Sequence, residues 1–341
     1  MYCVGNKLLA GVKSFYDDSR ACVRVSGSES EWFGVKVGLR QGCVMSPWLF
    51  NVFIDGVVRE VKSRLENGGA SMVGEDGSIW KLCQLLFADD TVLVADSEFK
   101  LRQLILEFCR ACDKRKLRVN IDKSKVLKCS RAGLIGELAI GINGELIEEV
   151  ENFKYLGSQI SVKGGTERDV NCRLNEASKC LGGLKSVLKN RYLGMESKKR
   201  LYESVIVQTV LYGAETWCLR ETERKKLNVF EMKCLRGMTG LYLRDRIRNE
   251  EIRRRIGVRK TMAEMADVRV LGWFGHMVRM GEDRVTKRVW NSKVSGTRPR
   301  GRPTMTWVDG VKKALVRREL SLCDGTERAL DRAGWRKIVR A

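Results

Sequence analysis

Histidine is nearly absent from this 341-residue sequence, in which His276 is the single copy. A structural zinc site usually needs four closely spaced Cys or His ligands. The sequence has one CxxC pair, Cys109 and Cys112, which lies in a segment with helical spacing and is followed by no second pair. We therefore expect no zinc site. The twelve Cys residues are scattered along a long chain, and we interpret them as buried, reduced thiols.

Long apolar runs are also missing. No run approaches the ~20 residues that a membrane-spanning helix needs, and the N-terminus lacks a basic segment followed by an apolar core and a small-residue cleavage site. These absences argue against a membrane partner and favour an intracellular location, which includes the nucleus. A length of 341 residues predicts two or more lobes.

Acidic residues are scarce in the second half of the chain. Residues 1–160 carry 22 Lys and Arg against 21 Asp and Glu, whereas residues 161–341 carry 42 against 21. The net charge of +22 therefore lies almost entirely in the second half. Such a field attracts polyanions by counterion release, so we expect a nucleic-acid partner for this half. A basic, solvated helical surface is the simpler alternative.

Two adjacent carboxylates, Asp89 and Asp90, lie between two apolar runs in the segment LCQLLFADDTVLVAD, residues 82–96. The short flanks are rich in Leu, Val and Phe and predict a β-hairpin with a charged tip. Short patterns of this kind match by chance, and a solvated surface turn is one interpretation. The other is a divalent-metal site, because Mg²⁺ prefers oxygen ligands and relieves the repulsion between adjacent carboxylates.

A glycine-containing loop, GLRQGCVMS at residues 38–46, precedes a predicted helix. Its glycines permit close approach of a ligand, and the amide of Gln41 could hydrogen-bond it. Ser46 is predicted to cap the helix with Pro47 in its first turn, and apolar residues from Leu49 to Val61 form one stripe. Free amides at a helix start suit phosphate, although this pattern alone is weak.

The remaining segments alternate helix and strand up to residue 165. We predict a helix and a strand pair in residues 7–37, with Asp17 and Asp18 as turn or metal-binding residues, a helix near residues 101–112, and a strand in LRVNIDKSKVLKCS. Asn143-Gly144 predicts a hairpin, and ENFKYLGSQIS predicts a further strand. Beyond residue 165, apolar residues recur at spacings of three and four, which predicts a helical lobe with a basic exterior.

Two basic segments have an open interpretation. Lys123, after Asn120, could contact a phosphate or be a solvated edge lysine. The stretch TRPRGRPTMTW, with Arg298, Arg300 and Arg302, could lie in a narrow minor groove or be a basic Pro/Gly linker without groove preference.

The order of these elements resembles the palm of a reverse transcriptase of the non-LTR (LINE-like) retrotransposon type. The resemblance spans about residues 1–240 and depends on four segments taken together: GLRQGCVMSPWLFNVFIDG, LLFADDTVLVAD, LRVNIDKSKVL and NFKYLGSQIS. The segments WFGHMVRM and RPRGRPTMTW resemble the basic C-terminal extension of such elements. The implied fold is α+β: a partial right-hand polymerase fingers and palm with an antiparallel sheet and packed helices (1–165), an all-α thumb-like lobe (166–242) and a basic helical tail (243–341).

The resemblance also implies roles for individual residues. Asp89 and Asp90 would be catalytic and would bind Mg²⁺, or Mn²⁺ in its place. The nucleotide and template base would lie against Arg40, Gln41 and Gly42, with Lys123 near the triphosphate. The primer end would be supported by a hairpin that contains Phe153, Tyr155, Leu156 and Gly157. The implied partners are an RNA template, a DNA primer and a dNTP, and the implied chemistry is two-metal nucleotidyl transfer with metals about 3.5–4 Å apart.

One catalytic carboxylate of the family is not matched. The family's first catalytic aspartate lies upstream of the segment that resembles residues 7–16, so a chain that starts at Met1 would lack it. We expect an RNA-directed DNA polymerase that is incomplete as encoded. The alternative is a catalytically inactive remnant that binds nucleic acid through its basic half.

Overall fold

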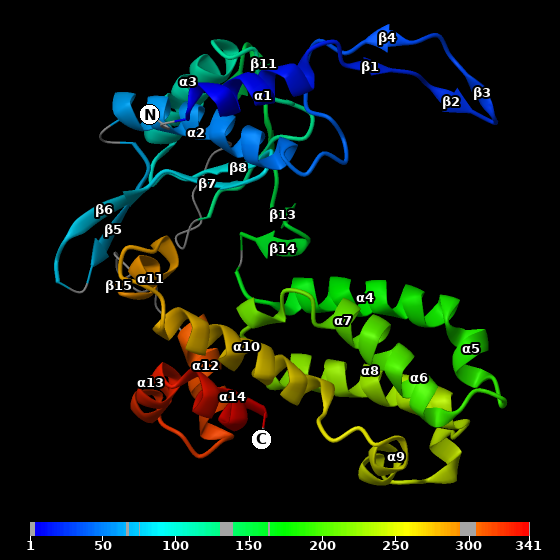
Figure 1. Cartoon of the computed structure of the whole chain (residues 1–341). Coiled ribbons are helices and arrows are strands. Elements are labelled where there is room, and N and C mark those ends of the chain that lie inside the picture. Colours follow the sequence, from blue (N-terminus) through cyan, green and yellow to red (C-terminus); the bar gives the residue numbers. More distant parts are fainter. Residues whose placement is uncertain are drawn as a thin grey trace. The chain divides into compact units, whose positions relative to one another are not determined.

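The computed structural model of the chain describes residues 4–65, 68–74, 76–129, 139–162, 164–293 and 305–340. It divides into two compact units (Figure 1). The first contains residues 1–69 and 83–118, and the second contains residues 70–82 and 119–341. Each unit is described by itself below.

Three helices form the body of the first unit: α1 (Asn6–Tyr16), α2 (Ser46–Arg64) and α3 (Glu98–Asp113). Helices α2 and α3 pack together through apolar stripes that bury Val57, Leu104 and Phe108. Ion pairs reinforce the contact, because the Glu60 carboxylate of α2 accepts a hydrogen bond from Arg115 Nη1 at 2.5 Å. The predicted helices are therefore confirmed in this unit.

The predicted N-cap of α2 is wrong. The helix begins at Ser46 itself, Pro47 lies in its first turn, and no side chain caps it. The Ser46 hydroxyl is buried and lies 2.7 Å from the Tyr16 hydroxyl of α1, so it joins two helices instead of binding an amide of its own helix.

Short strand pairs complete the first unit. In the predicted strand pair after α1, β1 (Arg20–Ala21) pairs with β4 (Phe33–Gly34), and β2 (Arg24–Val25) pairs with β3 (Ser28–Glu29). The third pair is the hairpin of β7 (Gln84–Phe87) and β8 (Asp90–Leu93), and β8 packs against α3.

The strands of the second unit also form small sheets. Strands β5 (Ala70–Gly74), β6 (Ile79–Leu82) and β15 (Ser292–Lys293) form an antiparallel sheet of three. The others pair two by two: β10 (Gly141–Ile142) with β11 (Glu145–Leu146), β9 (Lys125–Val126) with β12 (Glu148–Glu149), and β13 (Asn152–Tyr155) with β14 (Ser158–Ser161). In the residues described, the strands thus make seven separate small sheets, not one antiparallel palm sheet.

Two strand predictions have different outcomes. The hairpin predicted from Asn143-Gly144 is confirmed, because both residues have positive φ (51° and 88°), as a type I′ turn requires. The long strand predicted in LRVNIDKSKVLKCS is wrong, because among the described residues of this segment, 117–129, only Lys125 and Val126 form a paired strand. The preceding residues form a turn.

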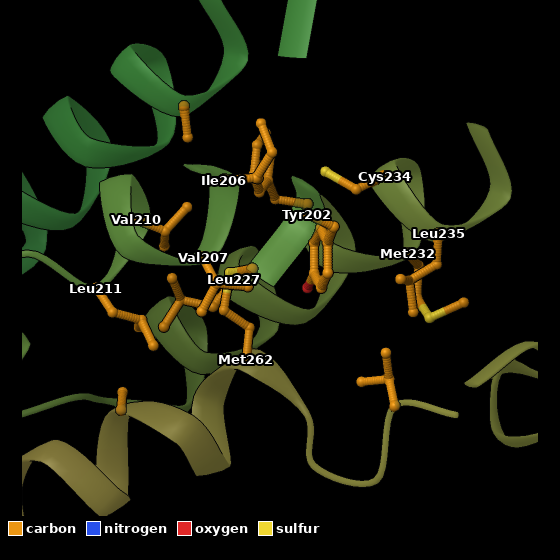
Figure 2. Packing of buried hydrophobic residues seen from close by; sticks show 14 of the residues in the cluster. Tyr202, Ile206, Val207, Val210, Leu211, Leu227, Met232, Cys234, Leu235 and Met262 are labelled. Carbon is orange, nitrogen blue, oxygen red and sulfur yellow. The ribbon is translucent and has the colours of Figure 1, made fainter. Parts of the chain in front are cut away.

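The predicted helical lobe is confirmed from residue 167 onward. Its helices are α4 (Glu167–Gly183), α5 (Lys185–Lys189), α6 (Met195–Leu201), the π-helical turn η1 (Tyr202–Val207), α7 (Gln208–Val210), the 3₁₀ turn η2 (Ala214–Thr216), α8 (Glu221–Thr239), the 3₁₀ turn η3 (Leu243–Asp245) and α9 (Asn249–Ile256). All of them except η3 contribute to one apolar core, in which Tyr202, Ile206 and Leu227 are fully buried (Figure 2). A buried ion pair, Arg253 Nη2 to Glu231 Oε2 at 2.9 Å, ties α9 to α8.

A second core lies around α10 (Met262–Val278), which contains the WFGHM segment. Against it pack α11 (Val285–Trp290), α12 (Trp307–Val316), α13 (Leu322–Leu330) and α14 (Arg332–Arg340). Trp335 of α14 is 3% exposed, and its indole N–H donates a hydrogen bond to the Leu271 carbonyl at 3.0 Å. The indole lies so close to α10 that only a glycine fits at position 275.

The eleven described cysteines form no disulfide with one another. The expectation that they are buried holds for four of them, Cys109, Cys112, Cys218 and Cys234, whereas five are partly exposed and Cys129 and Cys323 are exposed. Over the same residues, no helix combines the length and the apolar character that crossing a bilayer demands.

Candidate nucleotide-binding and metal-binding site

The β7–β8 hairpin presents two aspartates at its tip. Phe87 pairs with Asp90, so Ala88 and Asp89 form the turn between the strands. Ala88 has a φ of 52°, a left-handed conformation that costs an L-residue other than glycine about 1–2 kcal/mol. Asp89 and Asp90 are both exposed. The predicted hairpin with a charged tip is therefore confirmed, and its strain lies directly beside the carboxylates.

The Asp89–Asp90 pair offers a ligand set suited to Mg²⁺. Proteins often hold this ion with one or two carboxylates, while substrate phosphates and waters provide the remaining oxygens. Across the described ranges, no group of three His, Cys, Asp or Glu side chains could hold a metal ion. Two carboxylates are enough in number for one such ion, but they do not by themselves complete a two-metal site.

Asp17 and Asp18 form the other pair of adjacent aspartates in the first unit. Asp17 is the C-cap residue of α1, and Asp18 has a φ of 52° in the turn that follows. The Asp18 carboxylate accepts a hydrogen bond from Arg20 Nε at 3.1 Å. These contacts support the turn interpretation of Asp17 and Asp18.

The loop before α2 is open to solvent. Gly38 and Gly42 have φ values of 101° and 80°, and a Cβ added at either position would meet no heavy atom within 4 Å. Arg40 contacts the end of α1: its Nη2 donates to Ser19 Oγ at 2.8 Å, and its guanidinium carbon lies 5.8 Å from the Tyr16 ring centroid. Gln41 and Gly42 are exposed. The loop is thus anchored through Arg40, and its next two residues are accessible.

The start of α2 stabilises negative charge. Hydrogen bonds from the Ser46 side chain and from the backbone amides of Met45 and Ser46 lower the pKa of the Cys43 thiol. Free amides at a helix start favour a thiolate in the same way as they favour a phosphate oxygen. The exposed Gln41–Gly42 segment therefore leads into a locally electropositive helix start.

Lys123 lies in the second unit, in a turn closed by Asn120. The Asn120 Oδ1 atom accepts a hydrogen bond from the Lys123 amide at 3.0 Å, and its backbone carbonyl accepts one from Ser124 Oγ at 2.7 Å. The Lys123 side chain is exposed. By contrast, Lys125 at the start of β9 forms an ion pair with Glu148 of β12 at 2.6 Å.

The segment FKYLGSQIS is a hairpin that is fixed to the helical lobe. Leu156 and Gly157 form its turn, with φ values of 48° and 87°. The Leu156 carbonyl accepts a hydrogen bond from the Tyr212 hydroxyl at 3.1 Å, and the Gly157 carbonyl accepts one from Arg173 Nη2. The Arg173 guanidinium also stacks on the Tyr212 ring at 4.5 Å. Sequence reasoning missed these two partners, because Arg173 lies on α4 and Tyr212 in the turn after α7, where the only sequence signal is apolar spacing.

Asp169 of α4 is the second anchor of this hairpin. Its carboxylate is buried and accepts hydrogen bonds from the Gln159 amide of β14 and from the indole N–H of Trp217, both at 2.8 Å. Phe153 and Tyr155 lie in β13 and are half-buried. The hairpin and the helices after it therefore form one structural element.

The predicted site residues divide between the two units. The first contains Arg40, Gln41, Gly42, Asp89 and Asp90, and the second contains Lys123 and the 153–157 turn. Arg298, Arg300 and Arg302, predicted to contact nucleic acid, lie outside the described residues.

Comparison with known proteins gives the class of this chain. Residues 6–160 match the family model described as "Reverse transcriptase (RNA-dependent DNA polymerase)". This range includes the 38–46 loop, the Asp89–Asp90 hairpin and most of the β13–β14 hairpin. This part of the chain is therefore similar to a reverse transcriptase domain.

Curated relatives narrow the class. A transposon-derived protein of Caenorhabditis elegans is 26% identical over 273 residues, which are 76% of this chain and 95% of the relative. The RNA-directed DNA polymerase from mobile element jockey of Drosophila melanogaster is 23% identical over 247 residues (69% of this chain, 25% of the relative). The Pol polyprotein from type-1 retrotransposable element R2 of Popillia japonica is 25% identical over 206 residues (58% and 27%).

The particular kind of reverse transcriptase follows from these names. Jockey and R2 are non-LTR retrotransposons, so the chain is related to the reverse transcriptases of that group. The predicted resemblance is confirmed. The chain spans about a quarter of the length of the jockey and R2 relatives.

Proposed function

We propose that this chain supplies the metal-binding hairpin and nucleotide loop of an RNA-directed DNA polymerase, with Asp89 and Asp90 as ligands of Mg²⁺ or Mn²⁺. One observation carries the proposal: two exposed, adjacent carboxylates lie at the strained tip of a hairpin inside a reverse transcriptase domain. The bound ion would stabilise the charge that develops on the triphosphate oxygens.

The remaining residues would position the reactants. Gln41 and Gly42 line the nucleotide pocket, Lys123 contacts the triphosphate, and the 153–157 turn supports the primer end. In the reaction, the 3′ hydroxyl oxygen of the primer forms a bond to the α-phosphorus of the dNTP, the bond from that phosphorus to the bridging oxygen breaks, and pyrophosphate leaves. An RNA template selects the nucleotide by base pairing.

Turnover requires a further carboxylate beside Asp89 and Asp90. Two-metal catalysis needs ligands for both ions, and the described residues group no third acidic ligand with Asp89 and Asp90. Loss of one member of an interdependent catalytic set typically removes almost all activity. We therefore propose that the isolated chain binds a metal–nucleotide complex but does not polymerise.

A catalytically silent protein that only binds nucleic acid is the second candidate. One observation favours it: after position 160 the chain carries 42 basic residues and only 21 acidic residues. Such a protein binds RNA with a steep salt dependence, and its affinity for metal and nucleotide does not depend on Asp89.

Primer extension tests whether the site is complete. The chain is incubated with an RNA template, an annealed DNA primer, all four dNTPs and Mg²⁺ or Mn²⁺, beside Asp89→Asn. We expect no templated product above that of the variant. A product that requires Asp89 would show that the site is complete as it stands, and would overturn the need for another carboxylate.

A further inference from the structure

A large basic groove lies in the helical lobe, apart from every residue assigned above. Its volume is about 1620 Å³, and its walls come from the end of α5, the following loop, α6, α8, and the segment that contains η3. Small-molecule sites usually have volumes of about 300–1,000 Å³. The groove is therefore better matched to a polymer than to a mononucleotide.

The charge of the groove has one sign. Seven of its lining residues are Lys or Arg, and no described lining residue is acidic. Lys225, Lys233 and Arg236 recur along one face of α8, so their charges form a row parallel to the helix axis. Lys189, Arg191 and Arg244 lie on the other walls.

These cations are not neutralised by neighbouring acids. Among the described residues, no carboxylate forms an ion pair with any lining Lys or Arg, and Arg236 instead donates to the amide oxygen of Asn249 at 2.7 Å. Some cations of the same lobe that do not line the groove are paired, such as Arg200 with Glu196 and Arg254 with Glu251. The lining cations thus keep their charge free for a ligand.

The groove also contains a buried cation, Lys198. The residue is 6% exposed, and its ammonium donates to the Met238 carbonyl at 3.3 Å, in the last turn of α8. The negative end of the helix dipole stabilises a cation there. A buried ammonium without a carboxylate is costly unless an anion approaches from the groove.

The groove also offers apolar and aromatic surface. Val229 and Leu243 are 69% and 80% exposed among the cations, and Tyr242 is 57% exposed, with Arg244 stacked on its ring at 5.0 Å. A duplex would present mainly phosphates to such a surface. An unpaired strand presents phosphates and the faces of its bases, and aromatic rings stack on those faces.

We propose that this groove binds single-stranded RNA, with phosphates on the Lys225–Lys233–Arg236 row and a base stacked on Tyr242. The choice of RNA over DNA rests on the proposed function, in which RNA is the template. The groove itself is inferred from charge, burial and shape, and its binding does not require catalysis.

Fluorescence anisotropy with a short labelled oligo(U) tests the proposal in the full chain. EDTA is present, so that a failure of the Asp89–Asp90 metal site cannot affect the result. We expect Lys225→Gln with Lys233→Gln to weaken binding roughly ten-fold and to lower the slope of log affinity against log salt by about 1.4. The matched control, Arg200→Gln with Arg254→Gln, removes the same charge from paired positions and should change affinity less than about two-fold.

Two substitutions of Tyr242 test the proposed stacking of a base on its ring. Tyr242→Ala should weaken oligo(U) binding by roughly 5-fold to 100-fold, whereas Tyr242→Phe keeps the ring and should bind like the unmodified chain. Equal losses from the groove pair and the control pair would overturn the proposal. The proposal would also be overturned if duplex RNA or poly-glutamate competed as strongly as unlabelled oligo(U). Tighter binding of oligo(dT) than of oligo(U) would overturn the choice of RNA.

Discussion

Gly275 is predicted to be irreplaceable for the packing of α14 on α10. A Cβ at this position would lie 2.1 Å from Trp335 Nε1 and 2.3 Å from Trp335 Cδ1, so Gly275→Ala must displace the indole. Overpacking of a core costs about 1–3 kcal/mol, and breaking the 3.0 Å bond to the Leu271 carbonyl leaves buried groups unpaired at about 1–3 kcal/mol. Alanine regains about 1 kcal/mol of helix propensity, so we expect a net loss of about 1–5 kcal/mol.

The same helix provides the control. Gly272 is exposed, and a Cβ there would meet nothing within 4 Å. Gly272→Ala should therefore leave the free energy of unfolding unchanged or raise it by up to about 1 kcal/mol. Urea unfolding followed by tryptophan fluorescence measures both variants. Equal stability of Gly272→Ala and Gly275→Ala would refute the reasoning, because the two differ only in their contact with Trp335.

Three further predictions concern the candidate site and its support. Asp169→Ala should destabilise the second unit by about 2–4 kcal/mol, because the Gln159 amide and the Trp217 indole lose a buried acceptor; exposed Glu196→Ala should change unfolding by less than about 1 kcal/mol. Because its lowered pKa gives more thiolate at neutral pH, Cys43 should react with iodoacetamide at lower pH than Cys112, whose pKa burial raises to about 11. Mass spectrometry measures the extent of reaction of Cys43 and Cys112 at each pH. If Ser46→Ala left the pH dependence of Cys43 unchanged, the hydrogen bond from Ser46 would not be the cause of its lowered pKa. Ala88→Gly should relieve the left-handed turn and leave thermal stability equal or raised by up to about 1 kcal/mol, and clear destabilisation in calorimetry would contradict it.

Local signals in the sequence were sufficient for much of the fold. Apolar spacing located α3, α4 and α8, because each helix buries one stripe. Asn143-Gly144 located a hairpin, because both turn residues need positive φ. The Asp89–Asp90 tip was predictable for the same reason: two short apolar runs flank a polar turn.

Features that depend on distant contacts were not predictable. The pairing of β15 with β5 joins residues more than 200 positions apart, and Trp80 Nε1 donates to Ser292 Oγ across it. Ser46 resembles a cap in sequence, but its hydroxyl bonds to Tyr16 instead. The basic groove is assembled from segments that are separated in sequence, so charge counting revealed the excess of cations but not the place where they gather.

The central claim is that Asp89 and Asp90 form a metal–nucleotide site, and Mn²⁺ binding measures it most directly. Electron paramagnetic resonance follows free Mn²⁺ as it is titrated into the chain with dTTP present. We predict that Asp89→Asn with Asp90→Asn weakens this binding at least ten-fold, whereas Asp17→Asn with Asp18→Asn, which removes the same charge from the other aspartate pair, leaves it unchanged. Equal binding by both double variants would contradict the account.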